Sequence, residues 1–381
     1  MRVKLGDVCT VISGSTPKTG NTEFWDGDID WITPAELTDE SFIVHESVRK
    51  ITQAAVVKTG LRSFPAGTVI LSSRAPIGKV AIAGKEMYCN QGFKNLICGS
   101  MIHHEYLYWF LKGKTEYLNS LGRGATFKEI SKSIVEKVEI PLPAMPEQMK
   151  CAATFKAIWG IINLRKQQLA ELDNLVKCRF MEQFGGPGIQ SRYPTVTLGS
   201  ISNMISGGTP SSKHPEYFGG NIPFVSTPCL GPNFIDASAA QNWLTELGVQ
   251  MSSTHIVPAN SLMVGNRVGV GKSSINTCEM CTNQDILSFV DINTDKFDLL
   301  FVKKVIEQYG PIFESQKRGA TIKGVPSDLV KASQIPQVPI DVQRAFVGFV
   351  RQTDKFKFVV QQSLDETQKL FDSFMQEYFD S

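Results

Sequence analysis

Apolar residues recur with helical spacing in two long stretches of the chain, and each stretch follows a region rich in turns. In the first stretch these residues follow three- and four-residue steps, interrupted at Arg165. They are Ile158, Ile162, Leu169, Leu172 and Val176. In the second stretch they are Phe349, Phe356, Val360, Leu370 and Phe374. This spacing places side chains on one face of an α-helix, so it predicts two helices of about 35 residues, each near 50 Å long.

A lone helix of this length with an apolar stripe needs a partner, and the nearest candidate for each helix is the other one. We therefore expect the two helices to pack as an antiparallel coiled coil. The alternative is that each helix folds independently onto its own domain.

The regions before the helices are mixed. Glycine, proline, asparagine and aspartate separate short β-branched or aromatic runs, of which Thr68–Leu71 and Val80–Ala83 are predicted strands around a turn. Leu5–Ile12 and His104–Leu111 carry helical spacing and are predicted helices. This alternation predicts an α+β domain of about 140 residues with a mixed or antiparallel sheet.

The chain repeats itself. Ser13–Pro17 matches Ser206–Pro210 at a shift of 193 residues, and Arg123–Thr126 matches Arg318–Thr321 at a shift of 195. This period is far longer than that of a solenoid, so each unit is a whole domain followed by a helix. We predict an internal pseudo-two-fold repeat with two similar domains, at 1–145 and 187–339, separated by a central helix at 146–186 and a C-terminal helix at 340–381.

Composition limits the class of protein. The 381 residues are 42% hydrophobic and 20% charged, which excludes wholesale disorder and fits two or three domains. Asp7 interrupts the start of the chain, so we expect no secretory segment, no membrane span and a cytoplasmic protein. The eight scattered cysteines are typical of reduced thiols. The net charge is only +2, so any contact with a polyanion must be local.

No nucleotide-binding glycine loop is present. Cys278 and Cys281 have the spacing of zinc ligands, but no second pair follows and the repeat partner of Cys281 is Tyr88. Either a metal or two free thiols fit this pair, and the residues favour free thiols with no metal.

Asp28 and Asp30 resemble the acid pair of a metal-dependent nuclease. The second copy has Asn221 and Pro223 at these positions, and a unit doing the same chemistry would keep its carboxylates. We therefore expect no catalytic centre in the chain, although a nuclease using Asp28 or Asp30 stays open.

Both copies instead keep cations, amides and hydroxyls on glycine-containing turns, the residue types that contact DNA phosphates and base edges. Each residue has a structural alternative, since such turns are common and a single arginine is usually solvated. The candidate DNA-binding residues are Thr16, Arg74, Lys79, Gln91, Arg123, Thr126 and Lys128 in the first copy, and Thr209, Arg267, Lys272, Gln284, Arg318, Thr321 and Lys323 in the second.

In chain order, the motifs are Leu5-Gly6, Ile12-Ser13-Gly14-x-Thr16-Pro17, Trp25-x-Gly27-x-Ile29-x-Trp31, Arg74-x-x-x-Gly78-Lys79, Arg123-Gly-Ala-Thr126, Ile140-Pro-Leu-Pro143 and Phe180-Met-Glu-Gln-Phe184-Gly185. Their order and duplication resemble the specificity subunit of type I restriction–modification systems over essentially the whole chain.

The resemblance implies that each domain reads one half of a bipartite sequence in double-stranded DNA, and that the helices set the spacer. It also implies that the helices dock two modification subunits carrying the adenine methyltransferase and S-adenosylmethionine. Restriction subunits, which use ATP and Mg²⁺, would join them, and this chain itself would hold no cofactor and no active site. A stand-alone DNA-binding or scaffold protein of the same fold is the alternative.

Residues identical in both copies cannot distinguish two different half-sites, so the shared cations are assigned to phosphates. Base reading is expected where the copies diverge, around Glu36–Thr52 and Leu230–Glu246. We predict that Lys79→Ala weakens binding to all DNA and lowers the slope of log affinity against log salt by about one. A changed sequence preference with an unchanged slope would contradict that assignment.

Overall fold

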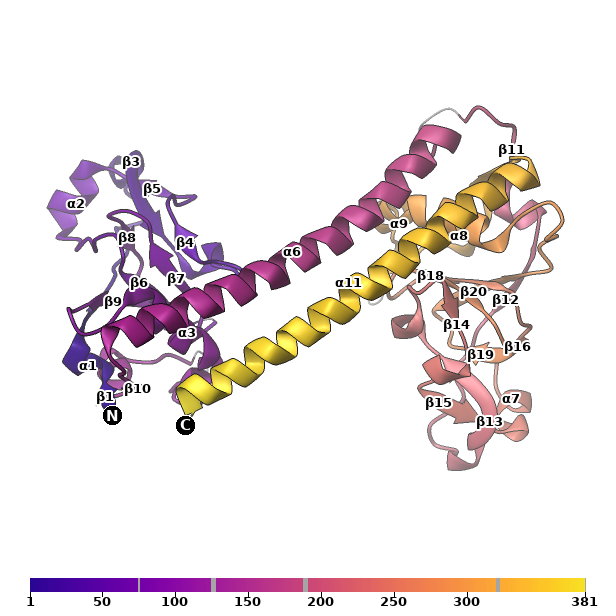
Figure 1. Ribbon diagram of the computed structural model, residues 1–381. Helices are drawn as coiled ribbons and strands as arrows, with labels where there is room; N and C mark the ends of the chain where they lie inside the picture. The colour runs from indigo at the N-terminus through magenta and orange to yellow at the C-terminus, as the bar shows by residue number, and fades with distance from the viewer. Residues whose placement is uncertain (75, 125–127, 188–190, 320–322, 381) are drawn as a thin grey trace. The chain divides into compact units, whose positions relative to one another are not determined.

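The two long apolar stretches form helix α6 (Met145–Phe184, 40 residues) and helix α11 (Ile340–Asp380, 41 residues) in a computed structural model of the protein (Figure 1). The structure describes residues 1–74, 76–124, 128–187, 191–319 and 323–380. At 1.5 Å per residue, each helix is about 60 Å long. Among the described residues, none of the helices has a stretch long and apolar enough to cross a membrane.

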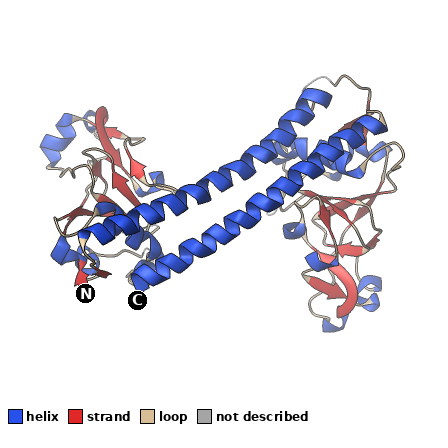
Figure 2. Ribbon diagram, in the orientation of Figure 1, coloured by secondary structure: helices blue, strands red, loops and turns tan. Residues whose placement is uncertain are grey.

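The chain divides into two units, and each unit contains half of both long helices. Unit 1 comprises Met1–Lys166 and Gln362–Ser381, and unit 2 comprises Gln167–Gln361. In each unit an α+β domain packs on these helix halves (Figures 1 and 2), which confirms the predicted fold class.

The two helices run antiparallel in both units. In unit 1, Phe155 of α6 packs on Phe371 and Phe379 of α11, with ring centroids 5.5 and 5.6 Å apart. In unit 2, Phe180 of α6 packs on Phe346 of α11 at 5.5 Å. Early residues of one helix thus meet late residues of the other. The paired arrangement is confirmed, and two helices without contact are excluded.

The domain of unit 1 is built on a mixed five-stranded sheet of order β2-β9-β6-β7-β4, in which β4 and β7 are parallel. Its strands are β2 (Cys9–Ser13), β9 (Phe93–Cys98), β6 (Val69–Ser72), β7 (Val80–Ala83) and β4 (Ile43–Val44). A three-stranded sheet holds β5 (Lys50–Ile51), β3 (Trp25–Ile32) and β8 (Tyr88–Cys89), and a two-stranded sheet holds β1 (Arg2–Lys4) and β10 (Glu139–Pro141). The predicted strands at Thr68–Leu71 and Val80–Ala83 are β6 and β7, so both are confirmed.

Unit 2 repeats this strand order, with one more strand in its second sheet, where unit 1 has only an isolated bridge between Phe64 and Met87. Its five-stranded sheet has the order β12 (Asn203–Ser206), β20 (Ile286–Val290), β17 (Leu262–Gly265), β18 (Ser273–Asn276) and β14 (Phe234–Ile235). Its second sheet has the order β15 (Asn242–Leu244), β13 (Phe218–Val225), β19 (Met280–Thr282) and β16 (Ile256–Val257). The third pairs β11 (Thr195–Thr197) with β21 (Gln334–Pro336). The duplication is therefore one of strand order as well as of sequence.

Short helices complete each unit. In unit 1 they are α1 (Leu5–Val8), α2 (Gln53–Thr59), α3 (His104–Gly113), α4 (Thr115–Ser120) and α5 (Lys132–Glu136). In unit 2 they are α7 (Glu246–Gln250), α8 (Leu299–Gln308), α9 (Gly310–Ser315) and α10 (Ser327–Lys331). Single 3₁₀ turns lie at Thr22–Phe24, Pro34–Glu36, Leu198–Ser200, Pro215–Tyr217, Thr227–Cys229 and Ala237–Ala239. The predicted helix at His104–Leu111 is α3 and is confirmed.

The predicted helix at Leu5–Ile12 is wrong beyond its first turn. The helix stops at Val8, and the chain continues as strand β2 from Cys9. Residues Cys9 and Val11 are buried on one face and pair with Cys98 and Leu96 of β9. Pairing with a distant strand therefore overrides the local helical spacing.

Candidate nucleic-acid interface

The Gly-x-Thr-Pro turn and the Asn-Gln turn meet in both units. The Thr16 hydroxyl donates a hydrogen bond to the side-chain oxygen of Gln91, and Thr209 does the same to Gln284. The amide nitrogen of each glutamine is then the group left to donate to a ligand. The turns lie so close that a Cβ on Gly14 would come within 2.2 Å of the Asn90 carbonyl oxygen, which explains the glycine at this position.

The two predicted arginines also come together, although they are far apart in sequence. In unit 1, Arg74 and Arg123 both form backbone bridges with Glu129, and Arg123 exchanges N–H···O bonds of 3.0 and 2.9 Å with it. In unit 2, Arg267, Gln284 and Arg318 line one open pocket of about 580 Å³. Gln91 adjoins the arginines of unit 1 through its neighbour Gly92, where a Cβ would lie 3.5 Å from Nε of Arg74. We call these sets, Arg74–Gln91–Arg123 and Arg267–Gln284–Arg318, the arginine–glutamine frames.

The lysines lie in different settings. The Lys79 ammonium donates to the backbone carbonyl of Leu37 and lines a second pocket with Lys112 and Trp159, so it is partly used within the domain. Its counterpart Lys272 is exposed. Lys128 and Lys323 are exposed. Thr126 and Thr321 lie outside the described residues.

The divergent segments expected to read bases are anchored to helices of their own unit. The Tyr108 hydroxyl on α3 donates to the carbonyl of Ser41 at 2.7 Å. In unit 2, the Asn233 amide donates to Asp354 on α11 at 2.6 Å. Both segments are thus held in place by the helices, and their role in base reading stays a prediction.

Asp30, one of the two acids of the nuclease alternative, is buried and fully engaged. It accepts hydrogen bonds from the backbone N–H (2.7 Å) and hydroxyl (3.1 Å) of Ser47, and it pairs with Lys85 at 2.6 Å. Burial opposes its ionisation, but the hydrogen bonds from Lys85 and Ser47 outweigh burial and lower the pKa of Asp30 below its usual range. Asp28 is exposed. The environment of Asp30 is therefore that of a structural ion pair.

We expect Asp30→Asn to reduce the free energy of unfolding at pH 7 by about 1–3 kcal/mol, because charge-assisted hydrogen bonds to Ser47 and Lys85 are lost. A carboxylate with a lowered pKa in the folded state stabilises above its unfolded pKa and loses that contribution as the pH falls. The difference in free energy of unfolding between wild type and variant should therefore be widest at pH 7. It should narrow below about pH 4, the usual pKa of an aspartate. Urea titrations at both pH values measure it, and a gap that is independent of pH would contradict the ion pair.

The cysteine pair does not gather a metal site in the described part of the chain. Cys281 is buried in β19, where burial raises the pKa of its thiol, and Cys278 is half-buried. Within the described ranges, no three histidine, cysteine or acidic side chains lie close enough to hold a metal ion.

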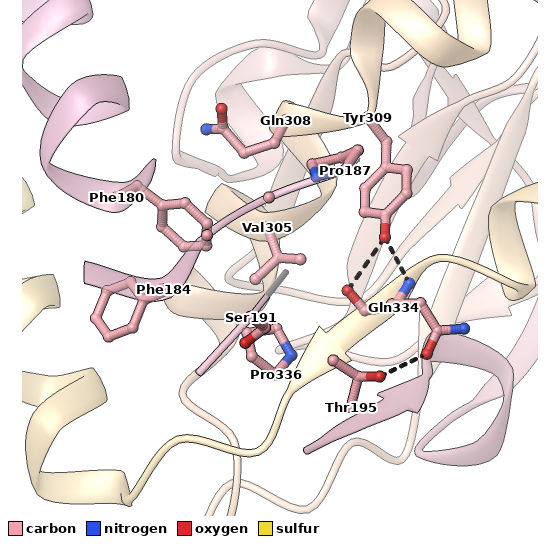
Figure 3. Close-up of a pocket in the computed structure, with 12 residues that line it drawn as sticks. Phe180, Phe184, Pro187, Ser191, Thr195, Val305, Gln308, Tyr309, Gln334 and Pro336 are labelled. Carbon is pink, nitrogen blue, oxygen red and sulfur yellow. Dashed lines mark hydrogen bonds between the residues drawn. The ribbon is translucent and has the colours of Figure 1, made fainter. Parts of the chain in front are cut away.

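A separate cavity of about 210 Å³ lies where the end of α6 meets the domain of unit 2 (Figure 3). Phe180, Phe184 and Val305 line its apolar side. On its polar side, the Gln334 backbone N–H donates to the Tyr309 hydroxyl at 2.8 Å, and the Thr195 hydroxyl donates to the Gln334 side chain at 2.9 Å. No lysine or arginine is among the described residues that line it, so this described lining lacks the charge that a nucleic acid requires.

Three features near the predicted site were not singled out from the sequence. The Arg49 guanidinium stacks 3.8 Å over Trp25 in unit 1. The buried Lys94 pairs with Glu129 at 3.1 Å beside the first arginine–glutamine frame. In unit 2, Asp285 lies 3.7 Å from Arg267. A position-by-position comparison of the two copies could have pointed to the Lys94–Glu129 pair and to Asp285, because these three residues all differ from their counterparts.

Comparison with known proteins gives one consistent result. The family model described as the type I restriction modification DNA specificity domain matches residues 1–174 and 190–366. The chain is 42% identical over 241 residues to the type I restriction enzyme MjaIX specificity subunit of Methanocaldococcus jannaschii, covering 58% of this chain and 56% of that protein. It is 25% identical over 250 residues to the EcoR124I/EcoR124II specificity subunit of Escherichia coli, covering 60% of this chain and 57% of that protein. The chain thus spans little more than half the length of these curated relatives.

Two solved structures share the fold over nearly the whole chain. One, from work on complex assembly and conformational transition of the type I R-M system, has a TM-score of 0.61 at 17% identity and covers 99% of this chain and 97% of its own. The other is the type I restriction-modification system S subunit from M. genitalium, with a TM-score of 0.55 at 15% identity, covering 100% and 96%. At these identities the likeness concerns the fold.

Proposed function

Because the chain belongs to the type I restriction modification DNA specificity family, we propose that it is the DNA-recognition subunit of a type I restriction–modification complex. Each domain reads one half of a bipartite target in double-stranded DNA, and the two helices set the spacer between the halves. The chain itself carries no catalytic centre.

One observation carries this proposal: the same threonine, glutamine and arginines are assembled twice, on matching turns of two matching domains. Thr16 bonds to Gln91 beside Arg74, and Thr209 bonds to Gln284 beside Arg267. Arginine and glutamine side chains on loops contact phosphates and base edges. A protein with one target element would need one such set, whereas a bipartite target needs two.

The long helices provide a surface for partner subunits. Three exposed apolar positions recur in both copies at a shift of 195 residues, which pairs Ile161 with Phe356, Leu164 with Val359 and Leu175 with Leu370. All six side chains are between 45 and 62% exposed. Each unit thus presents one of two equivalent apolar surfaces, which fits two copies of the same partner.

We assign these surfaces to two modification subunits, which would carry S-adenosylmethionine and the methyltransferase. Restriction subunits, with their ATP and Mg²⁺, would join that core. Such a complex acts on chromosomal and invading DNA, which places it in the cytoplasm.

Sequencing the methylated bases of a host that expresses this chain with a type I modification subunit tests the function. The expected result is adenine methylation at one bipartite sequence. Exchanging residues 1–145 for the domain of another specificity subunit should change one half of that sequence and leave the other half intact. No methylated motif, or a motif without two halves, would contradict the proposal.

We predict that Phe356→Ser combined with Val359→Ser weakens binding of one modification subunit by at least about 30-fold, because exposed aromatic and aliphatic anchors dominate such interfaces. Co-purification should then yield one modification subunit per chain where the wild type yields two. Both side chains are exposed, so the melting temperature should stay within about 1 °C of the wild type. As a control, Lys355→Ala, an exposed position beside Phe356, should retain two subunits.

Co-purification also distinguishes the proposed function from the alternative one. A stand-alone DNA-binding or scaffold protein of this fold would bind its target without any modification subunit. The repeated apolar positions on the helices favour the complex, because a chain working alone gains nothing from exposing them.

A further inference from the structure

The two arginine–glutamine frames are alike, but the residues around them differ in charge. At the strand next to the frame, Lys94 of unit 1 corresponds to Leu287 of unit 2. On the loop that follows the second arginine, Glu129 corresponds to Gly324. A lysine and a carboxylate have thus been exchanged for two uncharged residues at the same place.

In unit 1 a charged pair lies at this place. Lys94 is buried on β9, and its ammonium lies 3.1 Å from the Glu129 carboxylate and 3.3 Å from the Ser73 hydroxyl. Glu129 bridges the backbone at both Arg74 and Arg123, so this residue lies beside both arginines. Its carboxylate is paired with Lys94, and the Glu129 side chain remains 42% exposed at the surface of the frame.

In unit 2 the same place is open. Leu287 and Gly324 line the pocket of about 580 Å³ together with Arg267, Gln284 and Arg318. A Cβ at Gly324 would lie 2.7 Å from Cγ of Arg267, so the absence of a side chain there lets Arg267 lie across the loop. The side-chain oxygen of Asn266, also in the pocket wall, is buried without a hydrogen-bond partner among the described residues.

The charges of the open pocket favour an anion. Arg267 has Asp285 at 3.7 Å, whereas Arg318 has no carboxylate within 4 Å in the described part of the chain. Guanidinium groups bind phosphate oxygens with two parallel hydrogen bonds, and the Gln284 amide can add a third donor.

We propose that the pocket of unit 2 binds a backbone phosphate of DNA and that the Lys94–Glu129 pair blocks the equivalent contact in unit 1. The proposal rests on the function proposed above and adds that the two units hold DNA unequally. Unit 2 makes one phosphate contact that unit 1 lacks.

Two single substitutions and one exchange test this on the assembled complex with a duplex carrying its target. Arg318→Ala should lower the affinity about tenfold and reduce the salt slope by about one, since one phosphate contact is lost. Arg123→Ala, the matching change in unit 1, should lower the affinity less than about twofold. Lys132→Ala, an exposed lysine of α5 paired with Glu136, serves as a control and should leave the slope unchanged.

The exchange Lys94→Leu with Glu129→Gly installs the residues of unit 2 in unit 1 and leaves the net charge unchanged. In that background Arg123→Ala should lower the affinity for DNA as much as Arg318→Ala does in the wild type. If the exchanged protein does not fold, Glu129→Gln provides the same test, with a smaller expected increase in the effect of Arg123→Ala on the affinity for DNA.

Equal effects of Arg123→Ala and Arg318→Ala in the wild type would overturn the proposal. So would a changed base preference for Arg318→Ala at an unchanged salt slope, because that result assigns the pocket to a base. A wild-type complex that binds no DNA target would instead overturn the proposed function, and it would do so before any variant is compared.

Discussion

Phe155→Ala is expected to lower the free energy of unfolding of unit 1 by about 3–5 kcal/mol, the usual range for removing a buried phenylalanine. The Phe155 side chain of α6 is 1% exposed and lies between α3 and α11. It packs on Trp109 of α3 at 5.8 Å and on Phe371 and Phe379 of α11 at 5.5 and 5.6 Å. Its removal leaves a cavity where α6, α11 and the domain meet.

Tryptophan fluorescence during urea unfolding measures this effect, because four of the five tryptophans, Trp25, Trp31, Trp109 and Trp159, belong to unit 1. The matched control is Phe356→Ala, also a phenylalanine on a long helix but 58% exposed, which should cost less than about 0.5 kcal/mol. Similar losses for the two variants would mean that the aromatic cluster does not hold the helices to the domain.

Glu307→Ala should destabilise unit 2 by about 3–5 kcal/mol, because it leaves a buried charge without its partner. The Lys303 side chain on α8 is fully buried and donates to Glu307 and, at 3.0 Å, to the Asn233 side-chain oxygen. Burial lowers the pKa of Lys303. Burial also works against ionisation of Glu307, but Lys303 and Lys304 outweigh it and hold the pKa of this carboxyl below its usual range.

Thermal unfolding followed by circular dichroism checks this, with Glu314→Ala as the control. Glu314 pairs with Lys317 at 2.6 Å on the surface, so its loss should cost less than about 1 kcal/mol. Replacing both partners, Lys303→Met with Glu307→Leu, should recover part of the stability, because the fully buried Lys303 charge is removed and only Lys304, which pairs with Glu307 at 2.9 Å, loses its partner. A double variant as unstable as Glu307→Ala would contradict this explanation. It would show that the Lys303–Glu307 pair stabilises unit 2 by more than neutralising the buried charge.

The sequence predicted the features that depend on local pattern. The long helices follow from apolar residues at three- and four-residue steps, and the β6–β7 pair follows from β-branched runs around a turn. The duplication singled out Arg74, Gln91 and Arg123 as candidate DNA contacts, since all three recur. In unit 2 their counterparts line one pocket, and in unit 1 Arg74 and Arg123 meet at Glu129; their contact with DNA stays a prediction.

The features that the sequence did not predict depend on contacts between distant residues. Leu5–Ile12 has a helical pattern, but β9, more than 80 residues later, pairs with its second half as a strand. Lys79 is of a residue type that binds phosphates. The hydrogen bond that its ammonium donates to the carbonyl of Leu37, 42 residues earlier, can be seen only in the fold. Lys94 lies in a strand pattern, where a buried ammonium is unexpected until Glu129 is placed beside it.

The division of both long helices between the units has a consequence for synthesis on the ribosome. Unit 2 is one continuous stretch, Gln167–Gln361, so all of its contacts are available once that stretch has emerged. Unit 1 begins earlier but must wait for Gln362–Ser381, which includes Phe371 and Phe379. Of the two units, the one translated first is therefore the last to be completed, and until then the apolar surface around Trp109 and Phe155 is open to chaperones and proteases.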